Sequence, residues 1–297
     1  MFLAVSAQAQ FTFAFDYSYD TNNFFTGSNS GRQTYLESAG TYISNIFSQT
    51  SLNAITPTPG AAQPNTWDAT FTNPGDGSAQ AITNPTYAAN VYTIYAGGRA
   101  LGGSTLGQGG AGGFSASGYG DWFSDIRYRG NGTFNTGWGG SLTFDTATSW
   151  YFDSDINTVE AMGSAFDFFS VAIHEIIHVM GFGTTDSWTN LVDNGDPGEF
   201  NGTYATALFG SNPTLSSGNG HWAENTQSTV YGSETTQEAA MDPNIAANER
   251  KYITALDIAG LRDIGYSAVP EPSTVALIFG ISALSLVVIR RRFLLSR

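Results

Sequence analysis

The chain of 297 residues is long enough for one well-buried core. It carries 25 Asp and Glu residues against 11 Lys and Arg, and the formal charge of −14 argues against a nucleic-acid partner. The sequence contains no cysteine, which excludes disulfide bonds and thiol catalysis.

The N-terminus has features of a signal peptide. A short apolar stretch is followed by Ala-Gln-Ala, which ends at Ala9 and suits cleavage by a signal peptidase. The positively charged residues that begin a complete signal peptide are missing, so we expect residues 1–9 to be a truncated signal peptide. Export also fits the composition, because only 12% of residues are charged and Ser, Thr, Asn, Gln and Gly must supply most of the polar surface.

The first part of the body predicts a strand, a helix and a loop-rich segment. Residues 11–19 alternate between apolar and polar or small side chains, which is typical of a strand. Residues 32–47 place apolar side chains near helical spacing and predict the first helix. Residues 51–90 are polar and rich in Pro, Thr and Ala, so we expect strand fragments and loops there.

A second group of strands surrounds a glycine-rich segment. Residues 91–98 predict a strand that leads into a glycine-rich loop ending at Gly120. Residues 107–112 formally match G-x-G-x-x-G, but no helical pattern follows, so we exclude nucleotide binding and expect a flexible loop near the cleft. Residues 140–145 and 150–153 predict two further strands.

An acidic segment after these strands begins like a calcium loop. It runs Asp153-Ser-Asp-Ile-Asn157, but the glycine at the sixth position and the closing glutamate are missing, which excludes an EF-hand. The acidic loops are compatible with Ca²⁺ bound in another way, although no recognised motif supports it.

The stretch around residues 166–180 is apolar on most sides and predicts a buried helix. Within it, His174, Glu175 and His178 spell H-E-x-x-H, and residues four apart share one helix face. Two imidazoles can therefore bind one Zn²⁺ ion, whose catalytic sites typically have three protein ligands and a water. Glu175 is placed to take a proton from that water. We expect Gly181 to end the helix.

The third ligand must come from outside this helix. His221, in a glycine-rich segment, is the remaining histidine of three in the chain, and we rank it first. Carboxylates are the alternatives. Glu199 lies among turn-forming residues and ranks second, and Asp186, close behind the helix, ranks third.

Together these motifs resemble the metzincin clan of zinc metallopeptidases. H-E-x-x-H-x-x-G is followed much later by Gly-His-Trp and then by a methionine in Met-Asp-Pro-Asn. In the compact form of the clan another ligand comes three residues after the glycine, where this chain has Thr184. The chain is therefore most similar to the leishmanolysin-like branch, which has a long insertion before the third histidine. The resemblance implies that Met241 forms the Met-turn, which lies beneath the zinc without binding it.

The resemblance also implies a fold of the α/β (α+β) class. The catalytic domain, residues 10–268, would have an N-terminal lobe (10–181) with a twisted mixed sheet and two helices, including the zinc helix. The C-terminal lobe (182–268) would be mostly irregular and end in a helix. In metzincins the strand beside the zinc helix offers its edge to the substrate, a role that residues 140–145 or 150–153 would take.

The end of the chain predicts a final helix and a sorting signal. From Thr254, with Asp257 as its capping partner, the pattern is helical. Residues 269–297 then combine Val-Pro-Glu-Pro, an apolar run and three arginines, which resembles a PEP-CTERM sorting signal. The resemblance implies transient anchoring in the cell envelope through a short transmembrane helix (274–289) and removal of the tail by a membrane sorting protease. A permanent single-span anchor is the alternative.

The sequence thus predicts a secreted or cell-surface zinc endopeptidase acting on protein or peptide substrates. Zinc held by His174, His178 and His221 would activate a water, and Glu175 would be the general base. The alternatives are a non-catalytic surface or matrix protein with a structural or vestigial zinc site, and a zinc hydrolase of non-peptide substrates.

Overall fold

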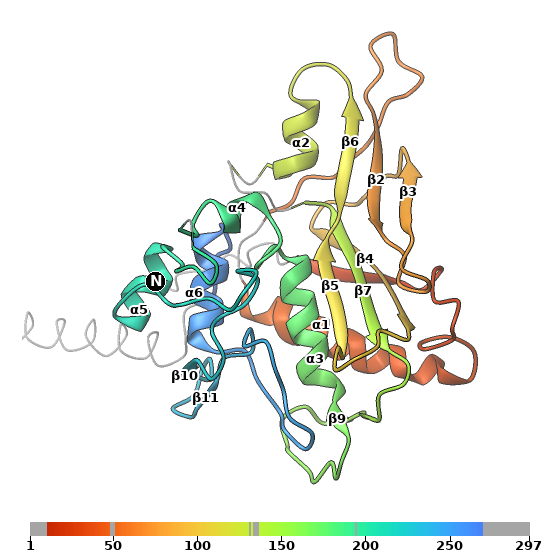
Figure 1. The fold of residues 1–297 in the computed structure, drawn as a ribbon. Coiled ribbons are helices and arrows are strands. Elements are labelled where there is room, and N and C mark those ends of the chain that lie inside the picture. The colour runs from red at the N-terminus through yellow and green to blue at the C-terminus, as the bar shows by residue number, and fades with distance from the viewer. Residues whose placement is uncertain (1–10, 48–50, 131, 133–136, 194, 270–297) are drawn as a thin grey trace, which may run out of the picture.

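The computed structural model is built around a four-stranded mixed sheet with strand order β1-β4-β7-β5 (Figure 1). The structure describes residues 11–47, 51–130, 132, 137–193 and 195–269. β1, β4 and β7 run parallel, whereas β5, at one edge, runs antiparallel to β7. The strands span Thr12–Asp16 (β1), Val91–Arg99 (β4), Gly139–Asp145 (β7) and Gly107–Ala111 (β5).

Two helices cover one face of this sheet. α1 (Gln33–Ile46), preceded by the 3₁₀ helix η1 (Gly27–Arg32), packs against α3 (Phe168–Val179), and both contribute to the main hydrophobic core. Leu142 and Phe144 of β7 point into the same core and are fully buried. The apolar surface of α3 is thus buried between the sheet and the C-terminal third of the chain.

The opposite face of the sheet carries a smaller antiparallel sheet of order β3-β2-β6. Phe71 of β2 stacks on Tyr95 of β4 with ring centroids 4.3 Å apart, in a second, aromatic core. Because successive residues of a strand point to opposite faces, Ile94 joins the main core while Tyr95 joins the second. The elements here are β2 (Thr66–Thr72), β3 (Ala79–Thr83), β6 (Gly113–Ser117) and α2 (Trp122–Tyr128).

The C-terminal third consists of short elements joined by long connections (Figure 1). α5 packs on α6, which begins with the Thr254–Asp257 capping box predicted from the sequence. The remaining bounds are β8 (Trp150–Tyr151), β9 (Phe166–Asp167), α4 (Asp186–Thr189), α5 (Thr203–Phe209), β10 (Gln227–Thr229), β11 (Thr236–Glu238) and α6 (Ala255–Asp263). The mixed arrangement of helices and several sheets is compatible with the predicted α+β class.

The glycine-rich segment is the main error of the sequence prediction. It forms the ordered strands β5 and β6 instead of a flexible loop. Glycine is normally depleted in strands, but here α3 lies directly on β5. A Cβ at Gly109 would come within 2.3 Å of the Glu175 carbonyl oxygen, and one at Gly107 within 2.7 Å of Glu175 Oε1. Tertiary packing therefore requires glycine at these positions.

The predicted substrate-binding edge is also misplaced. Residues 140–145 belong to β7, which lies between β4 and β5 and has no free edge. Residues 150–153 contribute only the two-residue β8, which pairs with β9. The exposed edge beside α3 belongs to β5 instead.

Both predicted targeting segments, residues 1–9 and 274–289, lie outside the described residues. Among the residues that the structure describes, no helix has the length and apolar character needed to cross a membrane.

Candidate metal centre

A buried network of charges fixes the start of α3. Asp167 caps the helix by accepting hydrogen bonds from the Ser170 backbone N–H (3.0 Å) and hydroxyl (2.6 Å). Arg250 binds the same carboxylate through two nitrogens, at 2.9 and 2.7 Å, and binds Asp153 at 2.8 Å. Because these side chains are buried away from water, each charge must be neutralised by its partner in the network. Asp153 of the calcium-like segment is thus engaged by an arginine.

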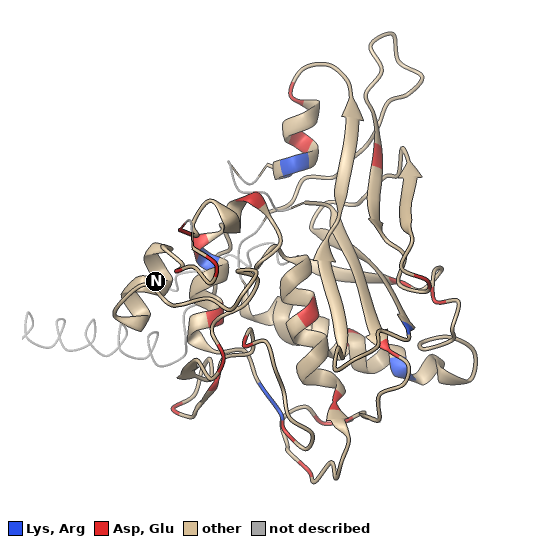
Figure 2. Ribbon diagram, viewed as in Figure 1, with Lys and Arg blue, Asp and Glu red and all other residues tan. Residues whose placement is uncertain are grey.

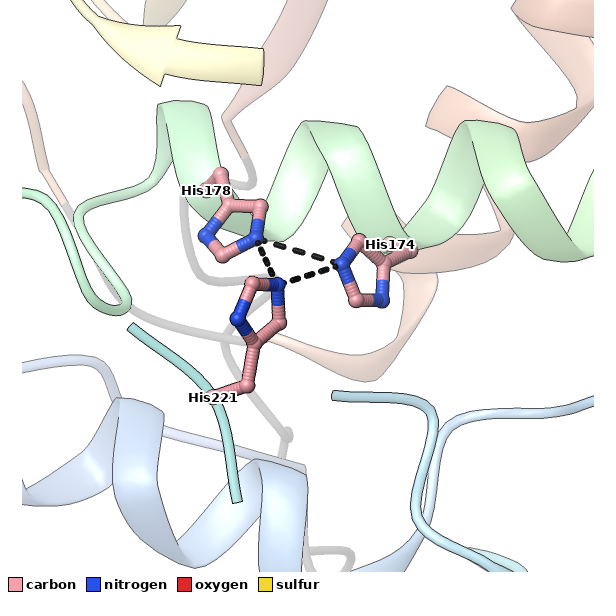
Figure 3. Close-up of side chains that lie close together, drawn as sticks. All are labelled: His174, His178 and His221. Carbon is pink, nitrogen blue, oxygen red and sulfur yellow. Dashed lines mark hydrogen bonds between the residues drawn. The ribbon is translucent and has the colours of Figure 1, made fainter. Parts of the chain in front are cut away.

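Three histidine side chains converge at the other end of α3 (Figure 3). The Nε2 atoms of His174 and His178 are 3.2 Å apart, those of His178 and His221 are 3.0 Å apart, and those of His221 and His174 are 3.1 Å apart. Four nitrogen ligands around zinc at about 2.0–2.1 Å in a tetrahedron would lie about 3.3 Å apart. The three rings therefore match the geometry of a zinc site closely.

Hydrogen bonds on the opposite sides of two rings identify the tautomers. His174 Nδ1 lies 2.7 Å from the carbonyl oxygen of Ala240, and His178 Nδ1 lies 2.8 Å from that of Phe182. A carbonyl oxygen only accepts, so each Nδ1 carries the proton and each Nε2 carries a lone pair. Lone pairs facing one another at about 3 Å repel, and a cation between them removes that repulsion. The residues present therefore fit a metal ion.

Electrostatics keep the three rings neutral, which is the metal-binding form. Burial lowers the pKa of His178 to about 3, with a further contribution from the neighbouring His221. Burial likewise lowers the pKa of His174 well below its ordinary value, and the two other histidines add to the effect. The pKa of His221 is also lowered by burial, against the opposing charge of Asp242.

His221 is delivered by the segment that follows α3. This segment folds around four fully buried aromatic residues. The ring centroids of Phe182 and Trp188 are 3.8 Å apart, and those of Trp188 and Phe200 are 4.1 Å apart. Trp222, the fourth, comes directly after His221 and contacts Phe182 edge to face at 5.0 Å. The position of the third histidine is therefore set by tertiary packing of an aromatic cluster.

Asp257 connects this cluster to the rest of the site. Its buried carboxylate accepts hydrogen bonds from Trp222 Nε1 (3.0 Å) and from the backbone N–H groups of Ala240 (2.9 Å) and Met241 (3.1 Å). It also accepts from the Thr254 backbone N–H and hydroxyl. The Asp257 side chain thus fixes Trp222, which follows His221, and Ala240, whose carbonyl oxygen orients His174. The sequence identified Asp257 only as a helix cap, because its other partners are distant in sequence.

The other candidate residues have separate positions. Met241 is fully buried in the turn after Ala240, and its carbonyl accepts from the Trp222 N–H at 3.0 Å. Thr184 donates to the His178 carbonyl at 2.7 Å, so it helps to end the helix. Asp186 is exposed and pairs with Arg127 on α2, and Glu199 is exposed.

Neither carboxylate joins the histidines. Within the described part of the chain, His174, His178 and His221 are the group found to have metal-ligand geometry, and no acidic cluster of this kind supports a calcium ion. Gly181, with φ of +110°, follows the helix end as predicted.

A cleft of about 680 Å³ opens over the three histidines and is also lined by Glu175. Burial raises the pKa of Glu175 to about 8, and a hydrogen bond from the Gly109 backbone N–H opposes this rise. A nearby cation would lower the pKa again. Apolar side chains form part of the wall, namely Leu106, Phe166, Val171, Pro243 and Ile245.

Charged side chains are few in this cleft, and Figure 2 shows that they are also sparse over the described part of the molecule, with acidic residues more numerous than basic ones. Lys251 reaches the cleft, but its Nζ already binds Glu238 at 2.7 Å and the Asn244 carbonyl at 2.6 Å, with Asp242 at 3.5 Å. Its charge is therefore compensated within the protein.

No family model, curated protein or solved structure matches this chain.

Proposed function

We propose that the protein is a zinc-dependent endopeptidase. The observation that carries this proposal is the convergence of three histidine Nε2 atoms, 3.0 to 3.2 Å apart, in a cleft that also contains Glu175. Three histidine ligands leave one coordination position for water or substrate, which distinguishes a catalytic zinc site from a closed structural one.

Each residue of the site has a defined role in this proposal. His174, His178 and His221 hold the ion, and the hydrogen-bonded Nδ1 groups of His174 and His178 keep those two rings oriented. Zinc, when bound, supplies a Lewis acid and lowers the pKa of a water towards 7. The Glu175 carboxylate, held by the Gly109 N–H, accepts a proton from the attacking water and returns it to the leaving amine.

The free edge of β5 supplies a binding surface for an extended peptide. Leu106 accepts a hydrogen bond from Asp145 of β7, and Gly112 donates one to Gly139. Because backbone groups in an antiparallel ladder alternate in direction, those of Gly107, Gly109 and Ala111 face away from β7. The Gly109 N–H binds Glu175, so a peptide would pair with the N–H groups of Gly107 and Ala111. A peptide adding to this edge would lie beside the histidine cleft.

The wider assignment is part of the same proposal. The long segment between Gly181 and His221, and the buried Met241 beside Ala240, are what a metzincin of the leishmanolysin-like branch would have. Its two lobes would meet at the cleft. The sorting signal in residues 269–297 would deliver the protein to the cell envelope and anchor it there until a membrane protease removes the tail.

Glu175→Gln tests the mechanism, because it removes the base and keeps the shape of the side chain. The purified variant should retain the zinc content of the wild type and lose casein cleavage by at least about 100-fold. Elemental analysis and a casein assay measure the two quantities. A variant that cleaves casein at the wild-type rate would exclude Glu175 as the base, and a wild type without zinc would exclude the proposal.

A further inference from the structure

A second cleft, of about 590 Å³, lies on the other side of β5, between the central sheet and the small sheet. Its walls come from β2, β3, β5 and β7, and none of its lining residues is charged. The polar side chains are hydroxyls and amides, namely Thr70, Thr72, Gln80, Gln108, Ser141 and Thr143.

β5 separates this cleft from the histidine site. A Cβ at Gly107 or Gly109 would collide with Glu175, so these positions face α3. A Cβ at Gly110 would have no atom within 4 Å, so this position faces open space on the opposite side. Gln108 and Gly109 line both clefts. The two clefts are therefore adjacent, with one strand of glycine-rich backbone between them.

An extended peptide on the edge of β5 would reach both clefts. Its successive side chains would point to opposite faces of the enlarged sheet, so every second one would point towards the side of Gly110. Alternate side chains lie about 6.6–7 Å apart. Since the second cleft extends along β5 from Gln108 to Ala111, it has room for two of them.

We propose that the second cleft is a side-chain subsite for the substrate and selects uncharged polar residues, Ser, Thr, Asn or Gln, at alternate positions. This inference rests on the proposed peptidase function. The hydroxyls and amides of the cleft provide both donors and acceptors. A charged side chain would find no opposite charge among the residues that line the cleft.

Arg99 lies beside the cleft, and its nitrogen atoms bind neutral oxygen atoms of the protein. Arg99 donates to Thr143 Oγ1 at 2.9 Å and to Gln108 Oε1 at 2.7 Å, which holds the floor of the cleft in place. These contacts leave the Gln108 amide N–H₂ group as a donor for a substrate side chain.

Gly110→Leu tests the subsite, because the new side chain would fill the cleft without touching α3. Gly31→Leu is the matched control, since a Cβ at this distant, exposed glycine also meets nothing within 4 Å. We would profile cleavage of a peptide library with both variants and the wild type. Gly110→Leu should lose the preference for Ser, Thr, Asn and Gln at alternate positions by at least about tenfold. Zinc content should not change, and the control should match the wild type.

Binding provides a readout that needs no turnover. Both substitutions would be combined with Glu175→Gln, and the affinity for library peptides would be measured. The Gly110→Leu combination should bind Gln- or Thr-containing peptides about tenfold more weakly than the Gly31→Leu combination, with equal affinity for Ala-containing peptides. In the bound state, amide exchange at Gly107 and Ala111 should slow, because those N–H groups face the free edge.

The outcomes separate the two claims. Wild-type protein that cleaves no peptide would contradict the peptidase function, and the binding assay would still decide the subsite. Equal peptide profiles and equal affinities for the two leucine variants would overturn the subsite. A preference for Asp or Glu at the alternate positions would overturn its uncharged character.

Discussion

The metal centre has two halves that are held in different ways. His174 and His178 stand on one turn of a buried helix, and a backbone carbonyl orients each ring. His221 has no regular element of its own and depends on the aromatic cluster and on the Asp257 carboxylate behind Trp222. The helix half is thus set by local backbone geometry, and the loop half by contacts between distant segments.

We therefore expect the two halves to differ in how strongly they affect the free energy of unfolding and the affinity for metal. Contacts that hold α3 in the main core should contribute chiefly to the free energy of unfolding. Contacts that position His221 also belong in part to the main core, through Trp222, but they should affect zinc affinity in addition because they carry the third ligand. The following substitutions test that difference.

Loss of the third ligand should have the largest effect. His221→Ala leaves two imidazoles, and we expect zinc affinity to fall by more than about 100-fold, beyond the usual effect of an outer-shell residue. Competition with a chelator measures the affinity. Glu199→Ala is the control and should bind zinc as the wild type does. If Glu199→Ala lost zinc and His221→Ala kept it, the loop half would be wrongly assigned.

Arg250→Met should destabilise the helix half. It leaves the Asp167 and Asp153 carboxylates buried without their partner, at an expected cost of about 3–5 kcal/mol in the free energy of unfolding. Urea denaturation measures this change. Arg127→Met, which breaks the exposed pair with Asp186, should cost less than about 1 kcal/mol. Equal losses for the two variants would contradict a special role for the buried network.

Asp257→Asn should weaken the loop half. Trp222 and Ala240 bind different oxygens of this carboxylate, and the amide retains only one of them, so one of the two N–H donors faces an N–H₂ group in place of an acceptor. We expect zinc affinity to fall about 10–100-fold. Asp263→Asn alters a carboxylate at the other end of α6 that binds Tyr204 and Ala205, and should leave zinc affinity unchanged. Equal zinc affinity in both variants would remove Asp257 from the support of the site.

Gly109→Ala should have the smallest effect on zinc affinity, although it strains the packing of α3 on β5. The added methyl group must displace the Glu175 backbone from β5, and we expect the rate of casein cleavage to fall up to about tenfold while zinc stays bound. Gly31→Ala, at an exposed and open position, should cleave casein at the wild-type rate. An unchanged rate for Gly109→Ala would show that this close approach does not position the base.

The same division explains what could be predicted from the sequence. The first two ligands could be predicted from H-E-x-x-H, because helical spacing is local and brings His174 and His178 together regardless of the rest of the fold. His221 was found because the chain has so few histidines. The helix-capping role of Asp257 could be predicted, but its bonds to Trp222, Ala240 and Met241 and the strand β5 could not, because they depend on segments distant in sequence. Gly107 and Gly109 indicate a loop by composition, and only the presence of α3 against them explains a strand.

X-ray absorption spectroscopy of the zinc-loaded wild type tests the central claim most directly. The account predicts a first shell of three imidazole nitrogens and one oxygen at about 2.0–2.1 Å, with the multiple scattering typical of histidine rings. A first shell with two imidazoles and additional carboxylate oxygens would contradict the assignment of His221, and a protein that binds no zinc would contradict the account as a whole.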